Sequence, residues 1–230
     1  MTTTAQVLDA LSGVRDPELD ESLTDLRFVA GVEVDGSSVE VRLRLPTYFC
    51  APNFTYLMVS DADAAVRALS GVEEVSVLLE DHFASEEIND AVGAGARFAE
   101  AFPGQARGDL DGLRQLFQRK AFVARQGRVC DSLLRAGVTA QAVAAMHVAD
   151  LPDGHDSERC LALRAELGLD ARGDAPAFLR PDGGALDAAT LPRWLRVARL
   201  VRLSLEGNGG LCRSLLQTRY GIEDPEEAAA

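Results

Sequence analysis

The stretch from residue 39 to residue 69 combines two hydrophobic periods that meet at a turn. Apolar side chains occupy every second position from Val39 to Leu45 with charged side chains between them, a pattern typical of a strand with one buried face. Pro46 ends this run, and Pro52 lies where proline is well tolerated, at the first position of a helix. Beyond it, apolar residues recur at helical spacing, at Phe54, Leu57, Met58, Ala65, Val66 and Leu69. We therefore predict a strand, a short turn and a helix.

The segments around this stretch complete a small domain. We predict a short first helix that ends near Gly13, a strand with alternating apolar residues from Phe28 to Val34, and a hairpin turn that begins at Asp35-Gly36. A third strand is predicted after the helix, over Val75 to Leu79. Because a helix connects the second and third strands, we expect these two to run parallel with a right-handed crossover. The predicted order of elements is α-β-β-α-β.

From Asp109 onward the pattern is mainly helical. A long helix is predicted to run to Arg135, and a strong last helix from Leu191 to Leu205. The glycine-rich run at 207–210 is expected to stop this last helix, because glycine disfavours a helix interior by about 1 kcal/mol relative to alanine.

These elements predict an α+β fold, in which a small α-β-β-α-β domain with a mixed sheet precedes a mainly α-helical domain. We divide the chain into a first domain over 1–84, a connecting segment over 85–108 and a helical domain over 109–230 that binds a client or partner. No apolar run reaches the roughly 18 residues that a membrane span needs, and the first residues do not have the pattern of a signal peptide. We expect a cytoplasmic protein.

The net charge of −13 is concentrated in the first part of the chain. Residues 1–96 contain 5 basic and 18 acidic side chains, whereas residues 97–230 contain 18 of each. An acidic surface repels nucleic-acid phosphates and anionic lipid, so we expect neither nucleic acid nor a membrane as a partner. Metal ions or a basic protein are better candidate partners for an acidic surface. The simpler explanation is that the negative charge only keeps the protein in solution.

The four cysteines are widely spaced and form no C-x-x-C pair, which argues against a zinc knuckle and against a small disulfide scaffold. We interpret Cys130, Cys160 and Cys212 as packing residues. Cys50 lies in the predicted turn beside a helix N-terminus, where unpaired backbone N–H groups and the helix dipole favour a thiolate. Three roles remain open for Cys50: a metal ligand, a transient acceptor of sulfur or of a cluster, and a buried thiol.

Two further groups have side chains that bind metals. Asp16, before a proline, is either a candidate ligand or part of a turn. Glu80, Asp81 and His82 follow the third predicted strand and offer oxygen and nitrogen ligands that iron accepts. A solvated surface turn is the alternative interpretation of these three residues.

The last predicted helix has an arginine at every third position, at Arg193, Arg196, Arg199 and Arg202. We expect these arginines to meet the acidic first domain, with an acidic client as the alternative. The chain has no Gly-x-Ser-x-Gly elbow, and Lys120 is its only lysine, so neither a serine-hydrolase nucleophile nor a Walker-type phosphate loop is predicted. We do not expect an enzyme.

The first 80 or so residues resemble the SufT-type domain family of iron–sulfur cluster assembly factors. The resemblance rests on DPEL at 16–19, on DLRFVAGVEVDGSSVEVRLRL, on the single cysteine of the following turn and on GVEEVSVLLE after the helix. The family turn reads Gly-Cys-Pro, whereas this chain has Phe49 before Cys50 and Ala51 between Cys50 and Pro52.

The resemblance implies a factor that matures metal or iron–sulfur proteins, with Cys50 as the working thiol and Asp16 as the acidic residue before the proline. It implies a transient iron or iron–sulfur cluster as cargo and a client metalloprotein as partner. The extended chain also resembles accessory proteins of bacterial multicomponent di-iron monooxygenases, which implies a di-iron hydroxylase as the client. A homodimer would let two Cys50 thiols share a cluster. The alternative is an adaptor or chaperone-like protein that holds no metal.

Overall fold

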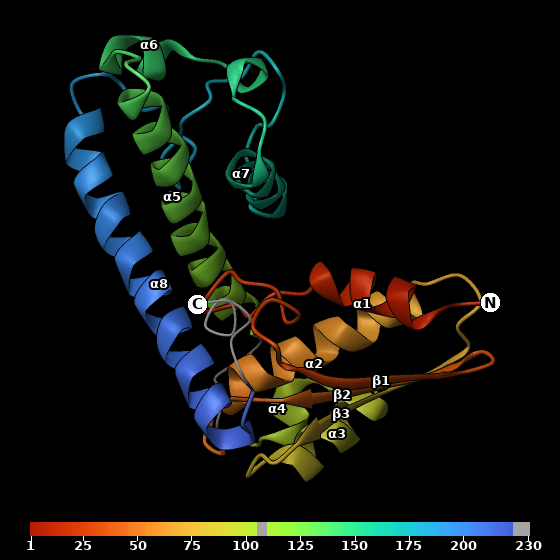
Figure 1. The fold of residues 1–230 in the computed structure, drawn as a ribbon. Helices are drawn as coiled ribbons and strands as arrows, with labels where there is room; N and C mark the ends of the chain where they lie inside the picture. Colours follow the sequence, from red (N-terminus) through yellow and green to blue (C-terminus); the bar gives the residue numbers. More distant parts are fainter. Residues whose placement is uncertain (105–109, 223–230) are drawn as a thin grey trace. The chain divides into compact units, whose positions relative to one another are not determined.

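The computed structural model describes residues 1–104 and 110–222, which form two compact units. The first unit consists of Met1–Gly112 together with Gly207–Ala230, and the second consists of Leu113–Glu206. The fold is α+β, as predicted, with a small mixed sheet in one unit and helices in the other (Figure 1). In the part of the chain that the structure describes, we find no helix with the length and hydropathy of a membrane span.

The first unit is built on a three-stranded sheet in the order β1-β2-β3. β1 pairs with β2 antiparallel, and β2 pairs with β3 in parallel, so both predicted strand pairings are confirmed. The elements of this unit are α1 (Thr4–Ser12), β1 (Val29–Asp35), β2 (Ser38–Arg44), α2 (Pro52–Arg67), β3 (Glu74–Glu80), α3 (Ser85–Gly93) and α4 (Phe98–Ala101).

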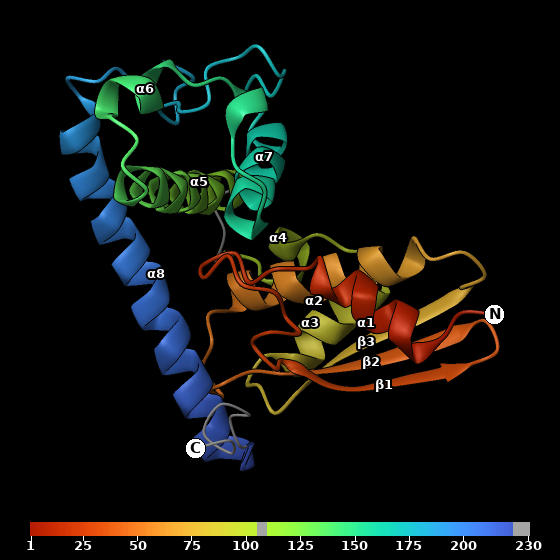
Figure 2. The same cartoon turned by 45° about the horizontal axis from the view of Figure 1, so that its top comes forward.

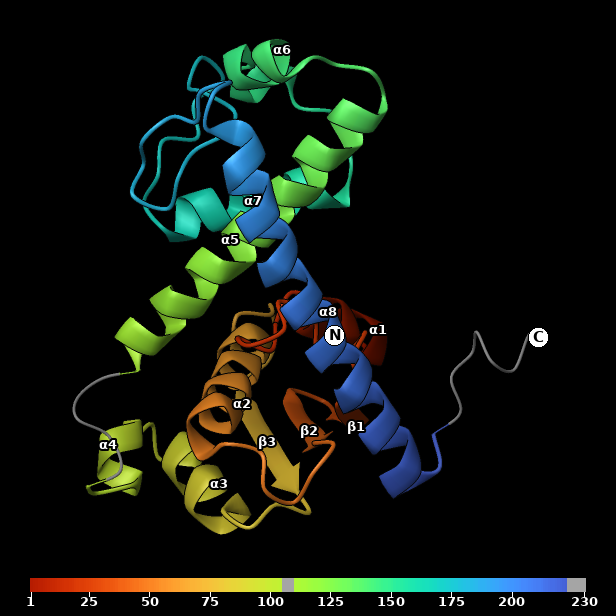
Figure 3. The same ribbon diagram turned by 90° about the vertical axis from the view of Figure 1, so that its left-hand side faces the viewer.

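The predicted strand, turn and helix at 39–69 form as β2, a connecting turn and α2. Val39, Val41 and Leu43 are buried while the residues between them are half-buried, which matches the alternation in the sequence. Pro52 is the first residue of α2, where its missing N–H costs no helical hydrogen bond. The β2–α2–β3 crossover brings the ends of β2 and β3 to the same edge of the sheet (Figure 3).

Helix α3 closes the free edge of β3 through one side chain. The Leu79 N–H donates to the Asn89 Oδ1 at 2.8 Å, and the Asn89 Nδ2 donates to the Leu79 carbonyl at 3.2 Å. The amide thereby replaces the backbone of a missing neighbouring strand, which protects an otherwise open edge.

The second unit contains α5 (Asp111–Arg135), α6 (Ala140–Ala145), the 3-10 helix η1 (Val148–Asp150), α7 (His155–Glu166) and the first turns of α8 (Leu191–Tyr220) (Figure 2). Buried polar side chains connect its helices to the irregular segment before α8. Gln126 of α5 exchanges two hydrogen bonds with the Leu179 backbone, both at 2.8 Å. Arg164 of α7 is fully buried and donates to the carbonyls of Pro176 and Ala177. Buried polar groups paired in this way specify one arrangement of the segment.

The prediction that residues 207–210 stop the last helix is wrong, because α8 continues without a break from Leu191 to Tyr220. Contacts of the later turns with the first unit offset the cost of three glycines. Leu216 is buried in the core of that unit, and Arg213 pairs with Glu21. At Gly209 a Cβ atom would lie 2.5 Å from the Glu21 Oε1, so glycine gives this carboxylate room.

Alanine substitutions in α8 should separate helix propensity from this packing. A Cβ at Gly207 would meet nothing within 4 Å, so Gly207→Ala is expected to stabilise the protein by about 0.5–1 kcal/mol. Gly209→Ala should stabilise the protein less than Gly207→Ala does, or destabilise it, because the added Cβ displaces the Glu21 carboxylate that pairs with Arg213. Urea unfolding of both variants tests this, and equal gains at the two positions would contradict it.

Candidate functional site

The predicted cysteine turn lies between β2 and α2, where Cys50 is half-buried. Cys50 comes directly before Ala51, the N-cap residue of α2. Its Sγ lies 3.3 Å from the Thr47 Oγ1, within hydrogen-bonding distance. The thiol therefore lies next to the N-terminus of α2, with the Thr47 hydroxyl beside it.

The segment after β3 holds this turn in place through two hydrogen bonds. The Nε2 of His82 donates to the Cys50 carbonyl at 2.8 Å, and the Phe83 N–H donates to the Tyr48 carbonyl at 3.1 Å. Because β2 and β3 are parallel neighbours, both segments leave the sheet at the same edge. The position of Cys50 is thus set by residues more than thirty positions later in the sequence.

His82 is a buried neutral group with both ring nitrogens in use. The side chain is only 3% exposed, and its Nδ1 accepts from the Ala84 N–H at 3.2 Å. With the Nδ1 accepting, the Nε2 carries the proton that it donates to Cys50. Burial lowers the pKa of His82, and the charge of Arg219 lowers it further. This arrangement favours a role in positioning Cys50 over a role as a ligand.

Glu80 and Asp81 have partners outside the cysteine turn. The Glu80 Oε1 lies 3.9 Å from the Arg42 Nε on β2. Asp81 adopts a φ of 51°, an uncommon conformation that Asp tolerates, and its carboxylate accepts from the Tyr220 hydroxyl at 3.3 Å. The chain bends here, between the end of β3 and the buried His82.

Asp16 is a buried carboxyl group that organises its own loop. Its Oδ1 accepts from the Glu18 N–H at 2.8 Å and from the Leu19 N–H at 3.1 Å, as in an Asx turn. Burial raises its pKa to about 6, against the lowering effect of these two hydrogen bonds. Of the two alternatives that the sequence left open, these contacts match the turn.

Cys212 joins this region, although the sequence pattern indicated only a packing residue. It lies in the part of α8 that belongs to the first unit and packs half-buried against the same apolar core as Cys50. Burial raises the pKa of the Cys212 thiol to about 12, and negative charge on Asp16 and on Cys50 acts in the same direction. Asp16 and Cys50 are thus each within electrostatic reach of Cys212. Cys130 and Cys160 are buried in the second unit, as predicted.

The donors at this site do not form a closed metal cage. Among residues 1–104 and 110–222, no group of three or more His, Cys, Asp or Glu side chains has the geometry to hold a metal ion. Structural metal sites are usually closed by four protein ligands.

Three exposed aromatic side chains surround the cysteine turn. Phe49 is 76% exposed, and its ring centroid lies 5.1 Å from that of Tyr48 and 6.2 Å from that of Phe83. Phe83 also lies against the ring of His82, with centroids 4.9 Å apart. A cluster of exposed aromatic rings is typical of a protein interaction surface.

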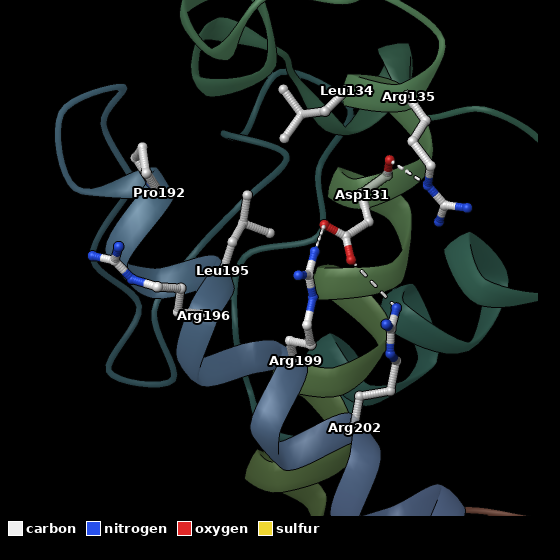
Figure 4. A pocket seen from close by; sticks show the side chains of 8 residues that line it. All are labelled: Asp131, Leu134, Arg135, Pro192, Leu195, Arg196, Arg199 and Arg202. Atoms are coloured by element: carbon white, nitrogen blue, oxygen red, sulfur yellow. Dashed lines mark hydrogen bonds and ion pairs between the residues drawn. The ribbon is translucent and has the colours of Figure 1, made fainter.

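Two arginines of α8 have an acidic partner inside the second unit. Arg199 and Arg202 both pair with Asp131 of α5, at 3.6 and 3.3 Å. They line an open pocket of about 570 Å³ together with Arg135 and Arg196 (Figure 4). This lining contains four arginines and one carboxylate, that of Asp131. The second unit has 14 basic and 11 acidic residues, so the pocket lies in the more basic unit.

Comparison with known proteins supports the resemblance found in the sequence. Residues 4–77 match the family described as iron–sulfur cluster assembly protein. An uncharacterized protein of Methanocaldococcus jannaschii is 34% identical over 91 residues, which cover 39% of this chain and 94% of that protein. Almost the whole of the archaeal protein thus corresponds to a part of this chain.

An iron–sulfur cluster carrier protein of Synechocystis sp. is 40% identical over 77 residues, which cover 34% of this chain. The chain spans only 21% of the length of that carrier. The family match over residues 4–77 includes Cys50.

Proposed function

The chain belongs to the iron–sulfur cluster assembly protein family, and from this premise we propose that it carries iron–sulfur clusters to client proteins. Cys50 is the working thiol, and the cluster is cargo. The observation that carries this proposal is the position of Cys50, half-buried at the start of α2 and fixed by His82. An accessible thiol at a helix N-terminus suits the transient binding of a soft metal centre.

The second unit supports the client-binding part of this proposal. Its four-arginine pocket complements carboxylates, and Val197 and Leu200 are exposed on the same helix. Arginine is well suited to bidentate carboxylate recognition. We infer that the client presents an acidic segment to this unit. A di-iron hydroxylase as that client, a cytoplasmic location and a homodimer that shares one cluster stay predictions.

The alternative is an adaptor that binds its client without metal. The observation that favours it is that the described residues contain no group of three or more His, Cys, Asp or Glu side chains that could hold a metal ion. In that case Cys50 is structural, and the aromatic rings around it provide the docking surface. Either function makes the chain an assembly factor without a substrate of its own.

Anaerobic reconstitution with iron and sulfide separates the two functions. We expect wild-type protein to retain both elements with a visible charge-transfer spectrum, and Cys50→Ser to lose most of the bound iron and sulfide. Cys130→Ser is the matched control, because Cys130 is fully buried in the second unit. Wild-type protein that binds neither element would reject the carrier function in favour of the adaptor. Cys50→Ser that binds as much as wild type would reject Cys50 as the working thiol.

A further inference from the structure

The last turns of α8 present one face to the first unit, and Cys212 lies on that face. Gly209, Cys212, Leu216 and Arg219 are spaced at three, four and three residues, so they share one side of the helix. Each of the other three positions contacts the unit: Gly209 adjoins the Glu21 carboxylate, and Leu216 is buried in the core. Arg219 donates to the carbonyls of Leu45, at 3.2 Å, and of Asp81, at 2.6 Å.

These contacts place the face of α8 that carries Cys212 against segments that flank the Cys50 turn. Leu45 directly follows β2 and precedes the cysteine turn, and Asp81 directly precedes His82, which donates to the Cys50 carbonyl. Glu21 belongs to the loop that follows Asp16, on the other side of Cys212 along the helix. Cys50 and Cys212 also pack against one apolar core.

We infer that Cys212 is the second thiol of the Cys50 site, so that one chain offers a pair of thiols to a soft metal or iron–sulfur cargo. The identity of the cargo rests on the proposed function, whereas the pairing of the thiols rests on the contacts of α8. Each thiol gives up its proton to solvent as its sulfur binds the metal. An iron–sulfur cluster has about four cysteine ligands. A pair of thiols from one chain leaves the remaining ligands of the cluster to a partner. Because this chain provides an incomplete set of ligands, the cargo can be transferred to another protein.

Cadmium binding tests the pairing without any cluster. The background is the protein with Cys130→Ser and Cys160→Ser, in which Cys50 and Cys212 are the remaining thiols. Loss of a group that only supports a metal ligand weakens metal binding by about 10- to 100-fold. Cys212→Ser removes a ligand itself, so in this background it is expected to lower Cd²⁺ affinity by about 100-fold or more. The ultraviolet thiolate-to-cadmium absorption should fall to about half.

Two controls make the result specific. Leu211→Ser alters an exposed neighbour on α8 and should leave Cd²⁺ binding unchanged. Cys212→Ala repeats the loss of the thiol with an apolar residue, and thermal melting checks that both Cys212 variants remain folded. Unchanged Cd²⁺ affinity and absorption in a folded Cys212 variant would overturn the inference.

Reconstitution of the same variants tells the two proposals apart. If Cys50→Ser loses the cluster while Cys212→Ser keeps it in full, the carrier function stands and the thiol pair is wrong. If wild-type protein takes up no cluster although Cd²⁺ binding needs both thiols, the pair stands and the carrier function is wrong.

Discussion

Replacing His82 by leucine is expected to lower the free energy of unfolding by about 2–4 kcal/mol and to release the cysteine turn. Leucine fills much of the same buried space but makes neither ring hydrogen bond. The Cys50 carbonyl then loses its donor, and the Ala84 N–H loses its acceptor. Because a buried polar group left unpaired costs more than a hydrogen bond contributes, most of the loss arises from these two backbone groups.

Urea unfolding measures this loss, and amide hydrogen exchange over residues 47–51 reports the release of the turn. His155→Leu is the matched control, since His155 is exposed at the start of α7 and its substitution should change stability by less than about 0.5 kcal/mol. A role for His82 in positioning Cys50 also predicts reduced cluster retention in folded His82→Leu. If the amides of the turn exchange at the same rate in His82→Leu as in wild type, that role is refuted.

Replacing Asp16 by asparagine is expected to stabilise the protein at neutral pH by up to about 3 kcal/mol. Burial raises the pKa of Asp16 from 3.8 to about 6, and a tenfold change in a proton-binding equilibrium corresponds to about 1.4 kcal/mol. The folded state therefore favours the protonated carboxyl, and stability falls as the pH rises from 3.8 to about 6. Asparagine carries no charge, and its Oδ1 can still accept from the Glu18 and Leu19 amides.

The sign of this effect gives a distinct pH profile. Wild-type protein gains the Asp16 contribution as pH falls through about 6, and the gain is complete below 3.8. His82 acts in the opposite direction, since its lowered pKa makes acid destabilising. The difference in the free energy of unfolding between wild type and Asp16→Asn isolates the effect of the Asp16 carboxyl. This difference should shrink by about 1 kcal/mol between about pH 7 and about pH 5. Urea unfolding at both pH values measures it, with exposed Asp153→Asn as the control. A difference that does not change with pH would contradict the burial effect.

Much of the first unit could be predicted from the sequence because its signals are local. Alternation over 39–45 predicts a strand wherever one face is buried, and Pro52 marks the start of a helix whatever packs on it. The strand-to-helix turn therefore puts Cys50 at a helix N-terminus by chain connectivity alone. The family resemblance rests on the same local segments.

Local patterns are thus sufficient to predict the α+β order of elements and the place of Cys50 within it. The surroundings of that thiol depend on contacts between distant parts of the chain. The partner of His82 lies 32 residues earlier, and the contacts of α8 reach back as far as Glu21, 192 residues before Arg213. Glycines at 207–210 predict a helix end by local propensity, yet burial of Leu216 and the ion pair of Arg213 outweigh that cost. Propensity acts between neighbours in the chain, whereas burial and pairing act between neighbours in space, and those are set only when the chain has folded.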